Sequence, residues 1–256
     1  MVIPGRTGLT PHVGHCFFPR GCYQVSCRGR SVLFPSGNRR FPMSEQTHDT
    51  DTTSRPLPAE PPGPPSGTPR VSFVPTDDEC RRLWDAFDML PNVREHSELV
   101  ACLATALAEA AARAGLTVNV AEVRAAALLH DLAKTYTIRH GGNHCQLGGA
   151  WVQELTGNPA LAQGVVCHVS WPKPLDLRAD FLPLALIYSD KRVKHNQIVT
   201  LETRFDDLLV RYGKTDFIRE RIRESFHQAE AIERALAETL GMNIHESTFG
   251  CGRLVE

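Results

Sequence analysis

A histidine and an aspartate stand side by side at the end of an apolar run, "AALLHDLAK", at residues 126–134. A buried carboxylate without a partner is costly, so a fold that buries His130 and Asp131 has to supply groups that compensate them. Val120, Val123 and Ala127 precede the doublet at helical spacing, which puts it on the face that points into the core. The doublet therefore predicts that other polar side chains meet it inside the protein.

The chain from residue 71 onward has helical patterning. Thr76-x-x-Glu79 is typical of a capping box, Asn119 before Glu122 resembles a second N-terminal cap, and Gly241 is typical of a C-terminal end. The expected helices span residues 76–90, 93–114, 120–134, 144–156, 159–169, 181–194, 198–212 and 215–240. No strand-like alternation is evident, so we expect an all-α helical core at 71–245, followed by a flexible tail at 246–256.

Residues 1–70 differ from this core in composition. They hold 12 of the 18 prolines, and residues 1–42 contain six arginines and no acidic residue. Such a composition predicts a disordered, Pro-rich leader and linker. Met43 is a candidate for the natural start of the protein. Residues 1–42 also contain no apolar run long enough to span a bilayer, and we expect no membrane partner.

Charge and cysteine usage limit the classes of partner. Outside the first 70 residues, which hold eight of the 28 basic and four of the 29 acidic side chains, 20 basic and 25 acidic residues give a formal charge of −5. This charge gives no electrostatic reason to expect nucleic-acid binding. The eight cysteines include no C-x-x-C pair, and Cys102, Cys145 and Cys167 lie in apolar helical patterns, where free cysteine behaves as a small hydrophobe. We therefore expect a cytoplasmic protein without a disulfide framework.

Four more histidine and aspartate residues lie on apolar faces of expected helices. They are His96, His144, His168 and Asp190. Each alone is commonly a satisfied core or helix-end residue, but together with the doublet they would leave several buried polar groups without partners. One or two divalent cations would satisfy all six, and imidazole with carboxylate suits iron, manganese, cobalt, nickel or zinc.

The order of these six residues resembles the HD-domain metal-dependent phosphohydrolase superfamily over residues 90–215. The strings that carry the resemblance are "REHSELV", "AALLHDLAK", "HCQLGGAWV" and "ALIYSDKR". Their H-S, HD-x-x-K and Y-x-D elements are most similar to bacterial symmetrical diadenosine tetraphosphate hydrolases.

The resemblance implies an HD-domain helical bundle and a set of metal ligands. A first metal would be held by His96, His130, Asp131 and Asp190. A second would be held by His144 and His168, with Asp131 bridging. His140, in the loop "RHGGNH", is an alternative to His144, and the chain departs from the family pattern after His168 with "HVSWPKP".

The resemblance also implies a reaction: metal-activated water cleaves a phosphoester or phosphoanhydride bond of a nucleotide or dinucleoside polyphosphate. Asp131 and Lys134 are the expected catalytic residues. The candidate substrate-binding residues are Lys134, Arg94, Arg139, Lys191 and Arg192. A di-iron oxygenase of the same fold and a non-catalytic metal-binding signalling module remain alternatives. The apolar stripe of residues 215–240 is expected to close the core, with a homodimer contact as the alternative.

Overall fold

The structure is a computed structural model that describes residues 22–27, 30–35 and 72–255. The chain divides into two compact units, Met1–Leu57 and Pro58–Glu256. In the first unit, strands β1 (Cys22–Cys27) and β2 (Arg30–Pro35) pair antiparallel as a hairpin. This hairpin was not expected from the sequence. The rest of the predicted disordered leader and linker, including Met43, lies outside the described residues.

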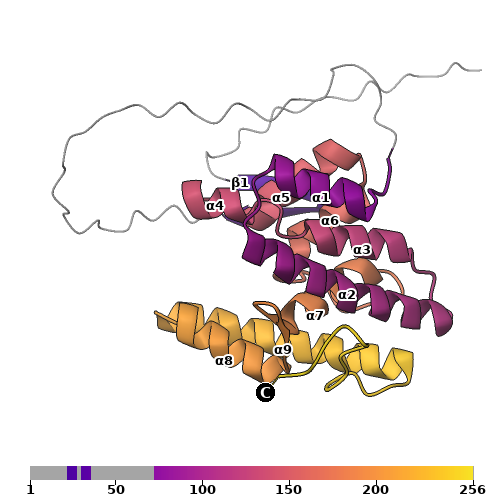
Figure 1. Ribbon diagram of the computed structural model, residues 1–256. Coiled ribbons are helices and arrows are strands. Elements are labelled where there is room, and N and C mark those ends of the chain that lie inside the picture. Colours follow the sequence, from indigo (N-terminus) through magenta and orange to yellow (C-terminus); the bar gives the residue numbers. More distant parts are fainter. Residues whose placement is uncertain (1–21, 28–29, 36–71, 256) are drawn as a thin grey trace, which may run out of the picture. The chain divides into compact units, whose positions relative to one another are not determined.

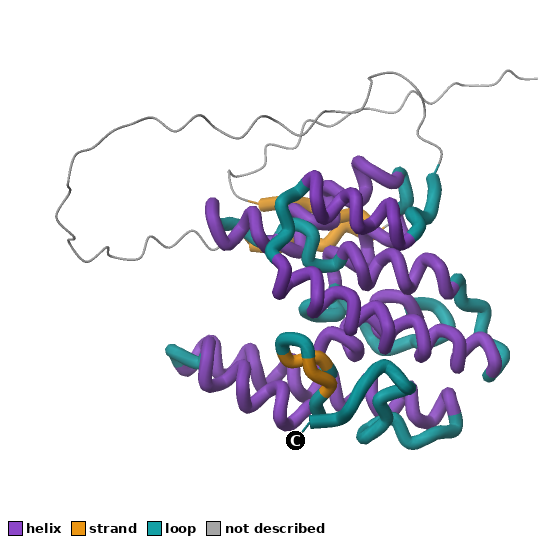
Figure 2. The backbone as a smooth tube through the Cα atoms, viewed as in Figure 1, coloured by secondary structure: helices purple, strands orange, loops and turns teal. Residues whose placement is uncertain are grey.

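The second unit is helical, which confirms the all-α class (Figures 1 and 2). Its helices are α1 (Asp77–Ala86), α2 (Pro91–Arg113), α3 (Val120–Leu129), α4 (Lys134–His140), α5 (His144–Thr156), α6 (Pro159–Cys167), α7 (Phe181–Lys191), α8 (Leu201–Tyr212) and α9 (Asp216–Leu240). Among the described residues, none of these helices combines the length and the apolar character needed to cross a bilayer.

The helix ends follow the capping residues in the sequence. Thr76 accepts a hydrogen bond from the Glu79 backbone N–H, and the Glu79 carboxylate accepts one from the Thr76 N–H, which completes the capping box of α1. The Asn119 side chain accepts from the Glu122 N–H at the start of α3. Gly241 ends α9 with a φ of +64°, a conformation that glycine adopts without steric cost. Local sequence therefore fixes where these helices begin and end.

The core is built around α2, α3 and α7, which pack against one another. Val100, Leu103 and Leu107 of α2 are fully or almost fully buried in it. Helices α5 and α6 pair with each other, and α6 packs against both α3 and α7. Helices α8 and α9 lie side by side, and α9 covers α7 (Figure 1). The C-terminal half of α9, where Ala229, Ile232 and Leu236 are buried, closes the core as expected, whereas Phe217 near its start is 75% exposed.

The structure breaks the helix expected over residues 120–134. Helix α3 ends at Leu129, and a turn follows in which the Leu132 N–H bonds to the Leu129 carbonyl and the Lys134 N–H bonds to the Asp131 carbonyl. Helix α4, which was not expected, starts directly after this turn. In a continuous helix, adjacent side chains diverge by about 100°. The turn removes that constraint and lets His130 and Asp131 face one centre.

A second small hairpin replaces the expected junction of two helices near residue 195. Strand β3 (Val193–Lys194) pairs antiparallel with β4 (Gln197–Ile198). The turn between them contains His195, which has a φ of +57°. Helix α7 therefore ends at Lys191 and α8 starts at Leu201, rather than at the expected 194 and 198.

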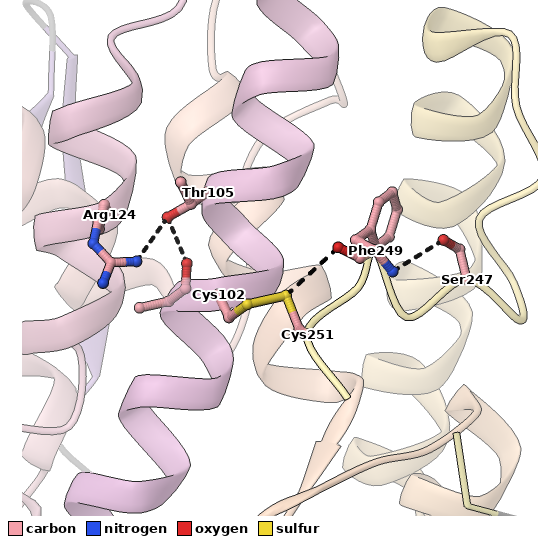
Figure 3. Close-up of a disulfide and its surroundings, with 7 residues drawn as sticks. Cys102, Thr105, Arg124, Ser247, Phe249 and Cys251 are labelled. Carbon is pink, nitrogen blue, oxygen red and sulfur yellow. Dashed lines mark hydrogen bonds between the residues drawn. A yellow bond between two sulfur atoms is a disulfide. The ribbon is translucent and has the colours of Figure 1, made fainter. Parts of the chain in front are cut away.

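The C-terminal residues are fixed to the core, which differs from the flexible tail expected at 246–256. Cys251 forms a disulfide with Cys102 of α2 (Figure 3), and the Val255 N–H bonds to the Ile198 carbonyl at 2.8 Å. The expectation that Cys102 is a free, hydrophobe-like cysteine is therefore wrong, because its partner lies 149 residues away in the sequence. Cys145 does remain a buried thiol, as expected.

We expect Cys251→Ser to lower the free energy of unfolding by about 3 kcal/mol, because the disulfide closes a long loop and restricts the unfolded chain. Denaturant unfolding with and without a reductant measures this. Reduction should destabilise the wild-type protein by a similar amount and leave the variant unchanged. Equal stability of the oxidised wild type and the variant would contradict the predicted contribution of the bond.

Candidate metal centre

The six histidine and aspartate residues singled out in the sequence come together in the second unit. His96 lies in the second turn of α2, and Asp190 lies in the last turn of α7. His130 and Asp131 occupy the turn after α3. His144 is the first residue of α5, and His168 directly follows α6. Five separate segments thus each contribute a metal-competent group.

Asp131 lies between two groups of histidines. Its Oδ2 is 3.4 Å from His130 Nε2. Its Oδ1 is 3.4 Å from His144 Nε2 and 3.6 Å from His168 Nε2. With only 1% of its surface exposed, this carboxylate can face one ion on each side.

Asp190 completes the first of the two groups. Its Oδ1 lies 2.9 Å from His96 Nε2 and 3.8 Å from His130 Nε2. In the second group, His144 Nε2 and His168 Nε2 are 3.2 Å apart. The arrangement matches the two sets of ligands that the family resemblance implies, with Asp131 shared between them.

Backbone carbonyls orient three of the imidazole rings. His130 Nδ1 lies 2.7 Å from the Ala127 carbonyl, and His168 Nδ1 lies 2.7 Å from the Val165 carbonyl. His96 Nδ1 lies 3.2 Å from the His195 carbonyl in the β3–β4 turn. A carbonyl only accepts, so in each ring Nδ1 is the donor. In the neutral ring the lone pair is then on Nε2, which points at the centre, as is usual for metal-ligating histidine.

Two buried polar atoms at the centre have no hydrogen-bond partner within the described chain. They are His130 Nε2 and Asp131 Oδ1. Leaving such atoms unsatisfied costs about 1–3 kcal/mol each. The facing Nε2 atoms of His144 and His168 would also repel if both carried lone pairs. A divalent cation bound among these nitrogens and oxygens removes each of these costs, so the residues fit a metal.

Electrostatics favour the protonation states that ligands need. Burial, followed by the nearby His130, lowers the pKa of His168 to about 3, and burial also lowers the pKa of His144. Burial raises the pKa of Asp131, but His130 and Lys134 outweigh it and hold that pKa well below its usual value. Asp190 behaves in the same way because of Lys191 and His96. At neutral pH these four groups therefore have free lone pairs.

His130 differs from the other histidines in its proton affinity. Burial lowers its pKa, but the charge of Asp131 and then that of Asp190 outweigh burial and raise the pKa above 6.5. Its Nδ1 is already a donor to a carbonyl, so the extra proton goes to Nε2. A metal must displace this proton to bind.

The structure also separates His144 from its alternative. His140 ends α4, is exposed, and contacts the ring of Tyr136 at a centroid distance of 4.5 Å. His144 lies at the centre with His168 and Asp131. Geometry therefore favours His144 as the ligand.

Cys145 is a neighbour of the centre that sequence reasoning did not include. Its Sγ lies 3.6 Å from His144 Nε2 and 3.9 Å from His168 Nε2. Burial, followed by the charge of Asp131, raises the pKa of this thiol to about 12, so it stays protonated at neutral pH without a metal. In the sequence, the position of Cys145 next to His144 is the only indication that this cysteine lies at the centre.

The expected substrate-binding cations fall into two groups. Lys134 Nζ contacts Asp131 Oδ2 at 2.7 Å and is 39% exposed, and Lys191 Nζ contacts Asp190 Oδ2 at 2.6 Å in the interior. These two lie at the centre.

The other three expected cations have structural partners. Arg94 binds Asp85 and the carbonyls of Met89 and Trp84. Arg139 pairs with Asp88. Arg192 is buried and donates to Tyr188 and to the Val199, Ile244 and Ser247 carbonyls. Through these partners, Arg94 holds the end of α1, Arg139 holds α4 and Arg192 holds the C-terminal segment. We therefore do not include the three arginines in the proposed site.

An open pocket of about 230 Å³ lies beside the centre, lined by His96, Asp131 and Lys134. Its lining also includes Arg204, Arg211 and Tyr212 from α8, together with His195 and Asn196 from the β3–β4 turn. A contribution of α8 to the site was not expected from the sequence. The pocket gives a substrate access to the buried carboxylate.

Residues 93–182 match the HD domain family. This segment contains five of the six residues, and Asp190 follows it by eight positions. The match supports placement in the HD superfamily of metal-dependent hydrolases, and it agrees with the clusters of histidine and aspartate that could hold a divalent metal.

Two curated relatives are both named Ribonuclease Y. The protein from Geotalea uraniireducens is 29% identical over 119 residues, which covers 46% of this chain and 22% of the relative. The protein from Opitutus terrae is 31% identical over 99 residues, which covers 39% of this chain and 18% of the relative. The match thus spans about a fifth of each relative. No solved structure matches the chain.

These relatives do not support the finer resemblance to diadenosine tetraphosphate hydrolases, which stays a prediction. The match to the HD domain family agrees with the resemblance that the same residues carry.

We expect Asp131→Ala to abolish metal binding, because it removes the one carboxylate that both groups of histidines share. His130→Ala should abolish it as well. Elemental analysis of the purified proteins measures bound metal, and circular dichroism checks that helicity is retained. His140→Ala is the matched control and should bind metal as the wild type does. Full metal content in Asp131→Ala would contradict the assignment.

Metal affinity is expected to fall as the pH drops through the range in which imidazoles titrate, because the raised pKa of His130 favours a proton on Nε2 that the metal has to displace. Calorimetric titration of Mn²⁺ at several pH values, in buffers of different ionisation enthalpy, measures both affinity and released protons. An affinity that does not change with pH, with no proton released, would show that His130 does not bind the metal through Nε2.

Proposed function

We propose that this protein is a metal-dependent phosphohydrolase that cleaves a phosphoester or phosphoanhydride bond of a nucleotide or dinucleoside polyphosphate. The observation that carries the proposal is the buried His/Asp centre that opens, at Asp131 and Lys134, onto a pocket. A divalent metal bound there would lower the pKa of a bound water molecule and polarise a phosphoryl oxygen.

The first group of ligands would be His96, His130, Asp131 and Asp190, and the second would be His144 and His168 with Asp131. The protein's own work is to hold these groups rigid. Backbone carbonyls orient three rings, and the buried Lys191 holds Asp190 by a 2.6 Å contact. Such positioning of charge is the main source of catalysis in phosphoryl transfer.

Lys134 would bind the substrate beside the centre. It lies in the pocket lining and is partly exposed, so its ammonium group can reach a phosphate while Asp131 keeps it in place. It would neutralise charge that builds up on the phosphoryl oxygens and on the leaving group. Asp131 would act beside it by orienting the histidines and the bound water.

A nucleotide-sized substrate is favoured by two features. The pocket is a compact opening of about 230 Å³ beside the centre, which can accept the phosphate end of a small molecule. The formal charge of −5 on residues 71–256 also gives no general attraction to nucleic acid.

Hydrolysis of RNA is the second candidate, and its support is the name of the two relatives, Ribonuclease Y. The metal centre would serve equally for a phosphodiester bond. Because the match covers only about a fifth of those proteins, it supports metal-dependent hydrolysis more strongly than it supports RNA as the substrate.

The test is a substrate panel. Purified protein loaded with Mn, Fe, Co, Ni or Zn should release phosphate or nucleotide from at least one nucleotide or dinucleoside polyphosphate, and Asp131→Ala should release none. Cleavage of an RNA oligonucleotide alone would support the second candidate. Oxygen consumption by the iron-loaded protein without phosphate release would support a di-iron oxygenase. Tight metal binding without turnover of any kind would support a non-catalytic module.

We expect Lys134→Met to lower kcat/KM by about 10–100-fold with the metal content unchanged, because it removes a charged hydrogen bond to the substrate phosphate, worth about 1.5–3 kcal/mol. Lys173→Met is the matched control, since Lys173 is similarly exposed and also pairs with an aspartate, Asp180. The control should be unaffected. Unchanged kinetics of Lys134→Met would remove Lys134 from the site.

A further inference from the structure

One carboxylate, Asp207, is shared by three cations at or near the wall of the pocket that α8 forms. Its oxygens lie 3.4 Å from Arg204, 3.5 Å from Arg211 and 3.9 Å from Lys194. None of these distances is that of a strong charged hydrogen bond, which is about 2.7–2.9 Å. One carboxylate therefore compensates three cations only in part.

Arg204 is the residue for which this imbalance is most costly. Its side chain is only 12% exposed, and its Nε atom is buried without a hydrogen-bond partner among the residues that the structure describes. A buried guanidinium that is incompletely paired is unfavourable, and an arginine normally finds planar, paired acceptors. Arg204 nevertheless lines the pocket, so an anion entering the pocket can reach it.

Arg211 extends the same positive surface toward solvent. It lies seven residues after Arg204, two turns further along the same face of α8, at a rise of about 10 Å. It is 43% exposed, and its guanidinium lies over the ring of Tyr212 at 5.2 Å. The pocket lining thus contains three cations, Lys134, Arg204 and Arg211, and two carboxylates, Glu95 and Asp131, of which Asp131 belongs to the metal centre.

We propose that Arg204 and Arg211 bind a phosphate group of the substrate other than the one at the metal centre, so that the enzyme prefers substrates with a chain of two or more phosphates. This inference rests on the proposed function, because it takes the His/Asp centre as the place where the bond breaks. Lys134 would hold the phosphate at the centre, and the α8 arginines would hold the rest of the phosphate chain. The exposed ring of Tyr212 offers a nucleoside a surface for stacking next to them.

A nucleoside oligophosphate fits these features better than RNA does. It concentrates several negative charges within the length of one small pocket, whereas an RNA strand spreads its phosphates and would extend beyond it. The formal charge of −5 on residues 71–256 also gives no overall attraction to a nucleic-acid strand.

The test is direct binding of inorganic tripolyphosphate and of inorganic phosphate to the full chain after its metal has been removed by dialysis against a chelator. We expect tripolyphosphate to bind more tightly than phosphate. Arg204→Met and Arg211→Met should each weaken tripolyphosphate binding about tenfold or more in isothermal titration calorimetry. Arg113→Met is the matched control. It lies at the exposed C-terminal end of α2, about 25 Å from His96 along the helix, and should bind as the wild type does.

Because Arg211 is exposed, its replacement leaves the fold intact even if Arg204→Met does not fold. Unchanged tripolyphosphate binding in Arg211→Met, or binding of a short RNA oligonucleotide with none of tripolyphosphate, would overturn the proposal. The measurement needs no turnover, so its outcome is separate from that of the substrate panel. If hydrolysis is found, the same variants should lose kcat/KM for an oligophosphate and keep it for a single-phosphate ester. Equal losses on both substrates would also overturn the proposal.

Discussion

The burial of one carboxylate among imidazoles is the interaction on which the rest of this structure depends. Asp131 is 1% exposed and lies within 3.4–3.6 Å of three histidines, and Lys134 contacts it from the pocket side. An ionised carboxylate at this depth is tolerated only if positive charge surrounds it. Lys134 and the raised proton affinity of His130 supply part of that charge. A divalent metal would supply the remainder and satisfy the atoms without partners.

The fold brings five of the six ligands to this point at or next to helix ends, whereas His96 lies in the second turn of α2. Helix α3 stops at Leu129, α5 starts at His144, α6 ends before His168, and Asp190 lies in the last turn of α7. At such ends, backbone carbonyls are free to accept from Nδ1 and orient the rings. The small β3–β4 turn adds the carbonyl of His195 for the same purpose. The backbone groups at these helix ends therefore both belong to the fold and orient the metal-competent side chains.

The stripes of apolar residues were enough to predict the helices of the second unit other than α4, and to indicate that six polar side chains face inward, because the residues that a helix buries recur with the helical period. The turn at residues 130–133 was not predictable in this way, since Leu132 and Ala133 continue the apolar run while the hydrogen bonding changes. Arg204 and Cys251 act with residues that are far away in the sequence. Local sequence patterns therefore do not predict the position of Arg204 in the pocket or the disulfide of Cys251. Arg94 and Arg192 stand next to ligands in the sequence, but their long side chains reach structural partners instead.

The most direct test of a metal at Asp131 is a crystal structure of the manganese-loaded protein with anomalous scattering recorded at a wavelength where manganese scatters strongly. This account predicts one or two anomalous peaks in contact with Asp131, one beside His96, His130 and Asp190 and the other beside His144 and His168. Coordination distances of about 2.0–2.3 Å to these nitrogens and oxygens would identify the ligands. An absence of peaks at saturating manganese, or peaks only at surface carboxylates away from Asp131, would contradict the account.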